Sequence, residues 1–109
     1  MFARQYRLPA SIRLTAPIVV HSPLFLMRIA TNNLSYNRYG FLVSKKVDKR
    51  SVVRNRVKRR VRACLEKLNP QVITGHDFLL SIKKESVDQK PEILSDVLIK
   101  ILVDKKLLK

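Results

Sequence analysis

Apolar residues recur at intervals of three and four between residues 50 and 68. The positions concerned are Val53, Val57, Val61, Cys64, Leu65 and Leu68. This spacing places them on one face of an α-helix, and the polar residues between them cover the remaining faces. Ser51 is expected to cap the start of this helix, and Asn69-Pro70 to end it, because proline cannot continue the hydrogen-bond ladder. We therefore predict an amphipathic helix over residues 50–68.

Other segments carry patterns typical of strands. Residues 24–30 are rich in apolar side chains and are predicted to form a buried strand, and residues 36–44 alternate in polarity and are predicted to be its antiparallel neighbour. Residues 18–20 are expected to add a strand at the edge of the sheet. Gly75-His76-Asp77 is typical of a turn, and it leads into a predicted buried strand over residues 78–84.

Two further helices are indicated nearer the ends of the chain. Residues 9–14 are predicted to form one helical turn or a short helix, closed by Pro17, and Pro91 marks the start of a longer helix with Asp88 as its cap. The apolar stripe of that longer helix is formed by Leu94, Val97, Leu98, Ile101 and Leu102. The order of elements predicts an α+β fold, a single-domain two-layer sandwich with helices packed on one sheet. A chain of 109 residues with 46% hydrophobic content is expected to form one domain over residues 1–109.

Positive charge is concentrated in the first predicted long helix and the segment before it. Ten of the 23 basic residues lie between Lys45 and Arg62, where the one acid is Asp48. Residues 1–65 hold 15 basic residues and one acid, whereas residues 66–109 hold eight basic residues and seven acids. The alternative interpretation is a solvated helix surface, but such surfaces usually interleave acids with bases to relieve repulsion. We therefore expect a polyanion, RNA or DNA, as the partner.

The residue types needed for protein-based catalysis are sparse. His21 and His76 are isolated in the sequence, and the eight acids are scattered, so we expect neither a catalytic residue nor a metal site in the protein. Cys64 is predicted to be a buried, inert thiol. The lone cysteine favours a reducing cytoplasm, the basic residues before Pro9 do not form an export signal, and no apolar run approaches the ~20 residues of a membrane-spanning helix.

The segment from Gly40 to Leu65 closely resembles the signature of the bacterial ribonuclease P protein component. The match covers about a quarter of the chain and includes Ser44-Lys45-Lys46, Arg54-Asn55-Arg56, Lys58-Arg59 and Arg62 in the family's spacing. The resemblance implies a mixed sheet with a βαβ crossover of left hand. It also implies a protein subunit that binds ribonuclease P RNA and the 5′ leader of precursor tRNA. The RNA, with magnesium held mainly by the RNA itself, then hydrolyses the phosphodiester at the mature 5′ end. The protein is expected to be monomeric in a one-to-one ribonucleoprotein without a membrane or an organic cofactor.

Roles can be assigned to individual residues on physical grounds. Those expected to bind RNA are Lys45, Lys46, Arg54, Asn55, Arg56, Lys58, Arg59 and Arg62. Asn55 has a second interpretation as a local cap, and Arg60 is expected to lie off the main face. Phe25 and Met27 are possible leader-binding residues, for which core packing is the alternative. Family members usually carry a longer N-terminal helix with a phenylalanine pair, which this chain lacks, so its N-terminal helix is expected to be short or absent.

Two functions of other classes remain open from the sequence. A ribosomal or assembly protein that binds structured RNA without catalysis has the same charge and size. A DNA-binding protein could place the basic helix in the major groove, although this use favours a dimer or a helix-turn-helix partner, and neither is visible in the sequence.

Overall fold

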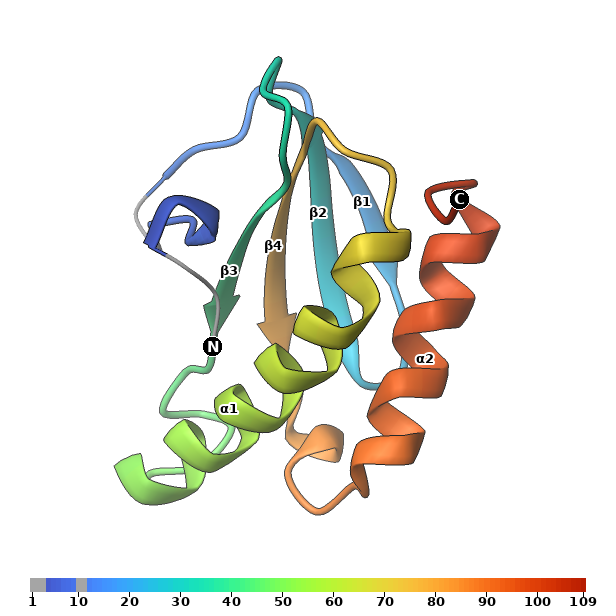
Figure 1. The fold of residues 1–109 in the computed structure, drawn as a ribbon. Helices are drawn as coiled ribbons and strands as arrows, with labels where there is room; N and C mark the ends of the chain where they lie inside the picture. The colour runs from blue at the N-terminus through green and yellow to red at the C-terminus, as the bar shows by residue number, and fades with distance from the viewer. Residues whose placement is uncertain (1–3, 10–11) are drawn as a thin grey trace.

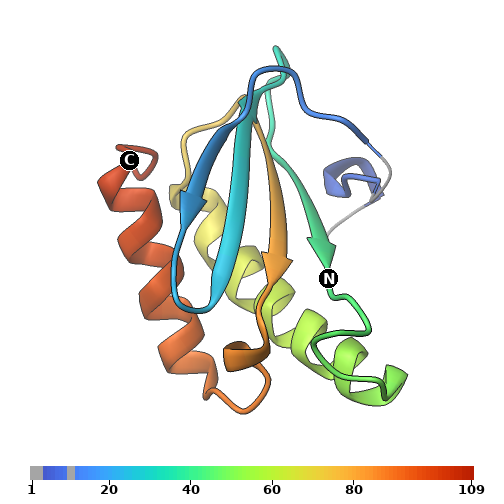
Figure 2. The same cartoon turned by 180° about the vertical axis from the view of Figure 1, so that it is seen from behind.

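The fold has two layers, a four-stranded sheet and two long helices. A computed structural model of the chain describes residues 4–9 and 12–109. The elements in chain order are β1 (Ile18–His21), β2 (Phe25–Thr31), β3 (Arg38–Leu42), α1 (Ser51–Leu68), β4 (His76–Ile82) and α2 (Pro91–Asp104), with short 3-10 turns at Arg4–Tyr6, Asn69–Gln71 and Lys84–Ser86. Both helices lie on the same side of the sheet (Figures 1 and 2). The predicted α+β sandwich is confirmed.

The sheet is mixed, with the strand order β1-β2-β4-β3. Strand β2 pairs antiparallel with both β1 and β4, whereas β3 pairs parallel with β4. The predicted edge strand at residues 18–20 is confirmed, but the predicted antiparallel pairing of residues 36–44 with residues 24–30 is wrong. Strand β4 lies between β2 and β3, so the two segments that are neighbours in sequence are not neighbours in the sheet.

The connection from β3 through α1 to β4 is a left-handed βαβ crossover. With α1 in front of the sheet, β3 and β4 both run downward and β4 lies to the right of β3 (Figure 1). Right-handed crossovers are the rule in about 98% of cases. The expected left hand is therefore confirmed, and it makes α1 run diagonally across the sheet from below the end of β3.

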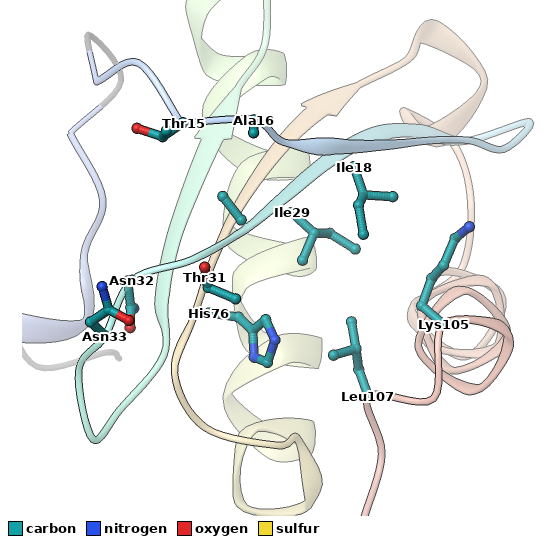
Figure 3. A pocket seen from close by; sticks show the side chains of 11 residues that line it. Thr15, Ala16, Ile18, Ile29, Thr31, Asn32, Asn33, His76, Lys105 and Leu107 are labelled. Carbon is teal, nitrogen blue, oxygen red and sulfur yellow. The ribbon is translucent and has the colours of Figure 1, made fainter.

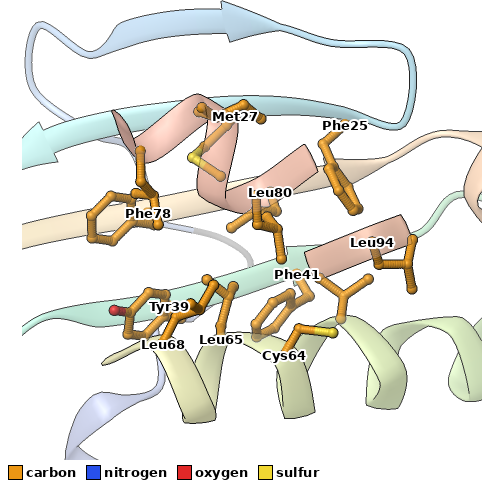
Figure 4. Close-up of a cluster of buried hydrophobic side chains, with 14 of the residues drawn as sticks. Phe25, Met27, Tyr39, Phe41, Cys64, Leu65, Leu68, Phe78, Leu80 and Leu94 are labelled. Atoms are coloured by element: carbon orange, nitrogen blue, oxygen red, sulfur yellow. The ribbon is translucent and has the colours of Figure 1, made fainter. Parts of the chain in front are cut away.

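The core forms where the two helices cover the sheet. All six predicted apolar positions of α1 are buried, as are Leu94, Leu98, Ile101 and Leu102 of α2, while Val97 is partly buried. Phe25, Met27, Phe78 and Leu80 of the sheet meet these stripes (Figure 4). The rings of Tyr39 and Phe78 stack with centroids 5.2 Å apart, and the Tyr39 hydroxyl donates a 2.7 Å hydrogen bond to Asn69 Oδ1 at the end of α1.

The prolines predicted one end of each long helix correctly, whereas the predicted side-chain caps are not formed. Helix α1 ends at Leu68 before Asn69-Pro70, and α2 begins at Pro91, as expected. In α1, Arg50 occupies the cap position without a side-chain cap bond, and Ser51 is the first helical residue. In α2, the cap position is occupied by Lys90 and not by Asp88. The predicted caps are therefore wrong. None of the helices in the described part of the chain is long and apolar enough to cross a membrane.

The N-terminal segment lies against the outer edge of β3. The Leu8 N–H donates a 2.8 Å bond to the Tyr39 carbonyl, and a Cβ on Gly40 would meet the Leu8 side chain at 3.2 Å, so glycine permits this approach. Residues 10 and 11 of the short helix predicted over 9–14 lie outside the described residues. The remaining four residues are not helical, although the Ile12 N–H donates a 3.1 Å bond to the Pro9 carbonyl.

A buried carboxylate joins β4 to β3 and to the turn after β2. Asp77 is 4% exposed and accepts two bonds from Arg38, Nε to Oδ1 at 2.8 Å and Nη2 to Oδ2 at 2.7 Å. The Asn32 side-chain amide donates a further bond of 2.9 Å to Oδ1. Burial raises the pKa of Asp77, but the bonds from Arg38 and Asn32 outweigh it and the pKa is lowered. The charged carboxylate is therefore stabilised in the folded protein.

We predict that Asp77→Asn lowers the free energy of unfolding at pH 7 by about 3 kcal/mol, because the variant leaves the partly buried Arg38 unpaired. The folded-state pKa lies below the unfolded value of about 3.9, so the contribution of Asp77 is present above that pH and is lost as pH falls through the folded pKa. Urea unfolding at pH 7 and at pH 2 to 4 measures this. A difference between the proteins that stays constant over the acid range would contradict the role of the charge.

Candidate nucleic-acid interface

Helix α1 turns one side to the core and leaves three sides available. Because its valines and leucines bury against the sheet, the charged residues between them must take the other directions. The β3 flank of the helix is formed by Arg54, Lys58 and Arg62. The outer face carries Asn55 and Arg59, and the α2 flank carries Arg56, Arg60 and Lys67. The predicted RNA-binding residues on the helix are therefore divided among all three sides.

The β3 flank lies beside the strand that precedes the helix. The guanidinium carbon of Arg62 is 5.5 Å from the centroid of the Phe41 ring, a cation–π contact that holds this side chain over the sheet edge. Lys58, Arg62 and Gly40 line a shallow hollow of about 140 Å³ that Arg7 of the N-terminal segment also borders. Lys58, Arg62 and Arg7 thus surround a concave surface of the kind that a phosphate backbone can enter.

The turn before α1 is organised by its single acid. Asp48 Oδ1 accepts bonds from the Arg50 backbone N–H at 2.8 Å and from Arg50 Nε at 3.1 Å, and Asp48 Oδ2 accepts from Arg50 Nη2 at 3.0 Å. The side-chain bond from Arg50 and then its backbone bond lower the pKa of Asp48 to about 2. Arg54 Nη1 donates to the carbonyls of Asp48 and Lys49, both at 2.9 Å. Asp48 is thus charged at neutral pH and fixes the start of the helix.

Lys45 and Lys46 lie in the exposed turn that follows β3. The strand ends at Leu42, two residues earlier than the predicted boundary, and the Val47 N–H closes the turn with a 3.0 Å bond to the Ser44 carbonyl. The two lysines therefore extend the basic surface at the first turn of α1, from a loop and not from the strand end that the sequence predicted.

The outer face is open to solvent. Asn55 and Arg59 are exposed, and neither side chain has a hydrogen bond or ion pair within the described part of the chain. The interpretation of Asn55 as a local cap is therefore not supported. An amide with free donor and acceptor atoms next to free guanidinium groups can bind phosphates and sugar hydroxyls.

The α2 flank is partly used within the protein. Arg60 Nη1 donates a 3.3 Å bond to the Val87 carbonyl in the segment before α2. That Arg60 takes no part in RNA binding stays a prediction. Arg56 remains exposed. It borders a hollow of about 360 Å³ together with Arg50, Arg60 and Asp88.

Phe25 and Met27 do not belong to a binding surface. Both side chains are 0% exposed and lie in the core between the sheet and the helices (Figure 4). Strand residues alternate between the two faces of a sheet, and these two positions point toward the helices. Their possible leader-binding role is therefore corrected to core packing, the alternative given above.

Clustered metal ligands and a reactive thiol are the groups on which protein-based chemistry would most simply rest. No three histidine, cysteine or acidic residues gather as metal ligands among the residues described. Cys64 is buried at 7% exposure, and burial raises the pKa of its thiol, which disfavours the reactive thiolate. The prediction of a buried thiol is confirmed, and what the geometry offers is a cationic helix that can bind a polyanion.

Comparison with known proteins assigns this geometry to a family. The family model described as Ribonuclease P matches residues 14–106 of the chain. The chain belongs to the ribonuclease P protein family. The matched range includes the whole sheet, both helices and every residue of the predicted ribonuclease P RNA surface.

Individual relatives agree with this assignment. A ribonuclease P protein component of Alkaliphilus metalliredigens is 34% identical over 85 residues, which cover 78% of this chain and 76% of the relative. One of Synechocystis sp. is 33% identical over 67 residues, 62% of this chain but only 54% of the relative, so the chain spans about half the length of that ribonuclease P protein.

Solved structures of ribonuclease P proteins show the same fold. A Staphylococcus aureus ribonuclease P protein superposes with a TM-score of 0.81 at 19% identity, covering 96% of this chain and 92% of the other. The Thermotoga maritima protein gives a TM-score of 0.73 at 20% identity over 80% of this chain and 82% of its own. At these identities the likeness concerns the fold alone.

We predict that Arg59→Ala or Arg62→Ala weakens binding to ribonuclease P RNA. Each lost phosphate contact should lower the slope of log affinity against log salt by about 0.7 to 0.9. Affinities measured at several potassium concentrations give that slope. Lys100→Ala, which removes an exposed cation from α2, is the matched control. If the control lowers the slope as much as the α1 variants do, the charge of the protein as a whole, and not α1, governs binding.

Proposed function

We propose that this protein is the protein subunit of ribonuclease P and that it binds the catalytic RNA through α1. The RNA subunit would hydrolyse precursor tRNA to give the mature 5′ end. The observation that carries the proposal is the set of cations on three sides of α1, with Asp48 already neutralised by Arg50 at its start. Such a surface repels itself in the free protein and gains most from a polyanion.

We assign the chemistry to the RNA subunit and not to side chains of the protein. A two-metal hydrolysis needs a cluster of carboxylates, and the described residues contain no such group. Asp48 lies in the turn before α1, and its carboxylate oxygens accept hydrogen bonds from Arg50. These residues do not fit a magnesium site, so magnesium in the proposed ribonucleoprotein would be held by RNA. The proposed assembly is one protein and one RNA in a reducing cytoplasm.

We propose that the 5′ leader binds to the face of the sheet opposite the helices. Leu26 and Arg28 alternate with the buried residues of β2 and are half-buried on that face. Among the residues that the structure describes, no helix covers this face (Figure 2). A guanidinium beside an aliphatic surface suits a single-stranded leader, because it offers charge to the phosphates and a plane on which bases stack.

We expect Arg28→Ala to reduce the affinity of the ribonucleoprotein for precursor tRNA with a 5′ leader while leaving its affinity for mature tRNA unchanged. Binding of the two RNAs to the holoenzyme measures the difference. Lys100→Ala again serves as the control. Equal losses for the two substrates would place Arg28 outside leader recognition.

Reconstitution tests the proposed function as a whole. Multiple-turnover cleavage of precursor tRNA by the cognate ribonuclease P RNA is measured at low magnesium, with the protein, without it and with protein alone. The proposal expects cleavage at the mature 5′ end to depend on the protein and expects no cleavage by protein alone. Tight RNA binding without any rescue would instead favour the structured-RNA-binding assembly protein that the sequence left open.

A further inference from the structure

A second concave site lies away from α1. It is a cavity of about 530 Å³ at the end of the sandwich where α2 stops and β1 begins. Its lining comes from the segment before β1, from β1 and β2, from the turn after β2, from the start of β4 and from the residues that follow α2 (Figure 3). None of these residues belongs to α1 or to the basic surface described above. The volume falls within the roughly 300 to 1,000 Å³ of ligand pockets.

The walls of this cavity are apolar. Ile29 and Leu107 are buried at its base, while Ile18 is 56% exposed on the same face of the sheet and directly pairs with Ile29. Ile18 is therefore exposed on the side of the sheet that the helices cover elsewhere. No segment of the described chain packs over it. A flat apolar group could lie between Ile18 and Leu107 (Figure 3).

The rim of the cavity is polar and cationic. The His76 ring borders it, and Nδ1 of that ring lies 3.3 Å from the Ile73 carbonyl. Because a carbonyl only accepts, this contact favours the tautomer with the proton on Nδ1, which leaves Nε2 as an acceptor. Lys105 supplies an ammonium group without a partner in the described structure, and Asn33 adds an exposed amide.

We propose that this cavity binds one unpaired nucleotide. The base would lie between Ile18 and Leu107, an exocyclic or ring N–H would donate to His76 Nε2, and the phosphate would lie near Lys105. A nucleotide has all three of these features, an apolar plane, a donor edge and an adjacent anion. The proposal rests on the proposed function in so far as the RNA partner would supply the nucleotide, and a free mononucleotide has the same chemistry.

The two sources are separated by two arms of one experiment on the full chain. In the first, backbone resonances are followed by NMR during titration with AMP, GMP, CMP or UMP and with the corresponding nucleosides. We expect saturable shifts at Ile18, Ile29 and Leu107. Lys105→Ala should weaken the binding of monophosphates and leave that of nucleosides unchanged, because only the monophosphate carries the anion.

The second arm measures affinity for ribonuclease P RNA. Ile18→Glu should weaken both mononucleotide and RNA binding by about tenfold, because it replaces the apolar wall against which the base lies with a carboxylate and adds a negative charge to a site that binds an anion. Val19→Glu is the matched control, since Val19 is 44% exposed on the same strand and points to the opposite face. If Ile18→Glu weakens mononucleotide binding alone, the occupant is a free nucleotide.

Three results would overturn the proposal. The first is the absence of saturable shifts in the cavity together with unchanged RNA affinity of Ile18→Glu. The second is an equal effect of Val19→Glu, and the third is a dimer that Ile18→Glu dissociates, because the cavity would then be a contact between two copies. Failure of the proposed function is distinguishable, since the mononucleotide arm uses neither α1 nor cleavage.

Discussion

The structure depends on the burial of the α1 stripe against the sheet. Six apolar side chains of this helix are buried, and five of them belong to the core that α1 shares with the sheet and α2. The crossover carries the helix diagonally over the strands (Figure 1). Burying side chains of this size contributes about 1.5 to 3 kcal/mol each, which is far more than the repulsion between exposed cations costs. The core therefore fixes the rotation of the helix, and that rotation forces the arginines outward.

Much of the fold could be predicted from local patterns in the sequence, whereas the pairing of the strands could not. The two helices and the strands have periodic apolar positions that report their burial, so Leu94 and Val57 were identified as core residues from the sequence. The insertion of β4 between β2 and β3 is a contact between distant segments, and nothing in the alternation of residues 36–44 encodes its partner. The left hand of the crossover contradicts the general rule and was expected only from the family resemblance. The cap predicted for α1 is wrong because Asp48 and Arg54 order the start of this helix in place of Ser51.

The basic surface could be predicted because the sequence shows ten basic residues and only one acid between Lys45 and Arg62. Its division into three sides, the contact of Arg62 with Phe41 and the use of Arg60 within the protein required the structure. Phe25 and Met27 show the limit of strand periodicity, which says that two residues share a face but not whether that face is covered. The cavity near His76 could not be predicted from the sequence, because its lining residues come from separate segments and form no motif.

Directed hydroxyl-radical probing of the ribonucleoprotein tests most directly whether α1 is the RNA surface. A single iron chelate would be attached through Arg59→Cys on the outer face of α1 or through Lys100→Cys on α2, with Cys64 left buried. We predict strong, localised cleavage of ribonuclease P RNA from position 59 and little from position 100. Equal cleavage from both positions, or cleavage from position 100 alone, would contradict it.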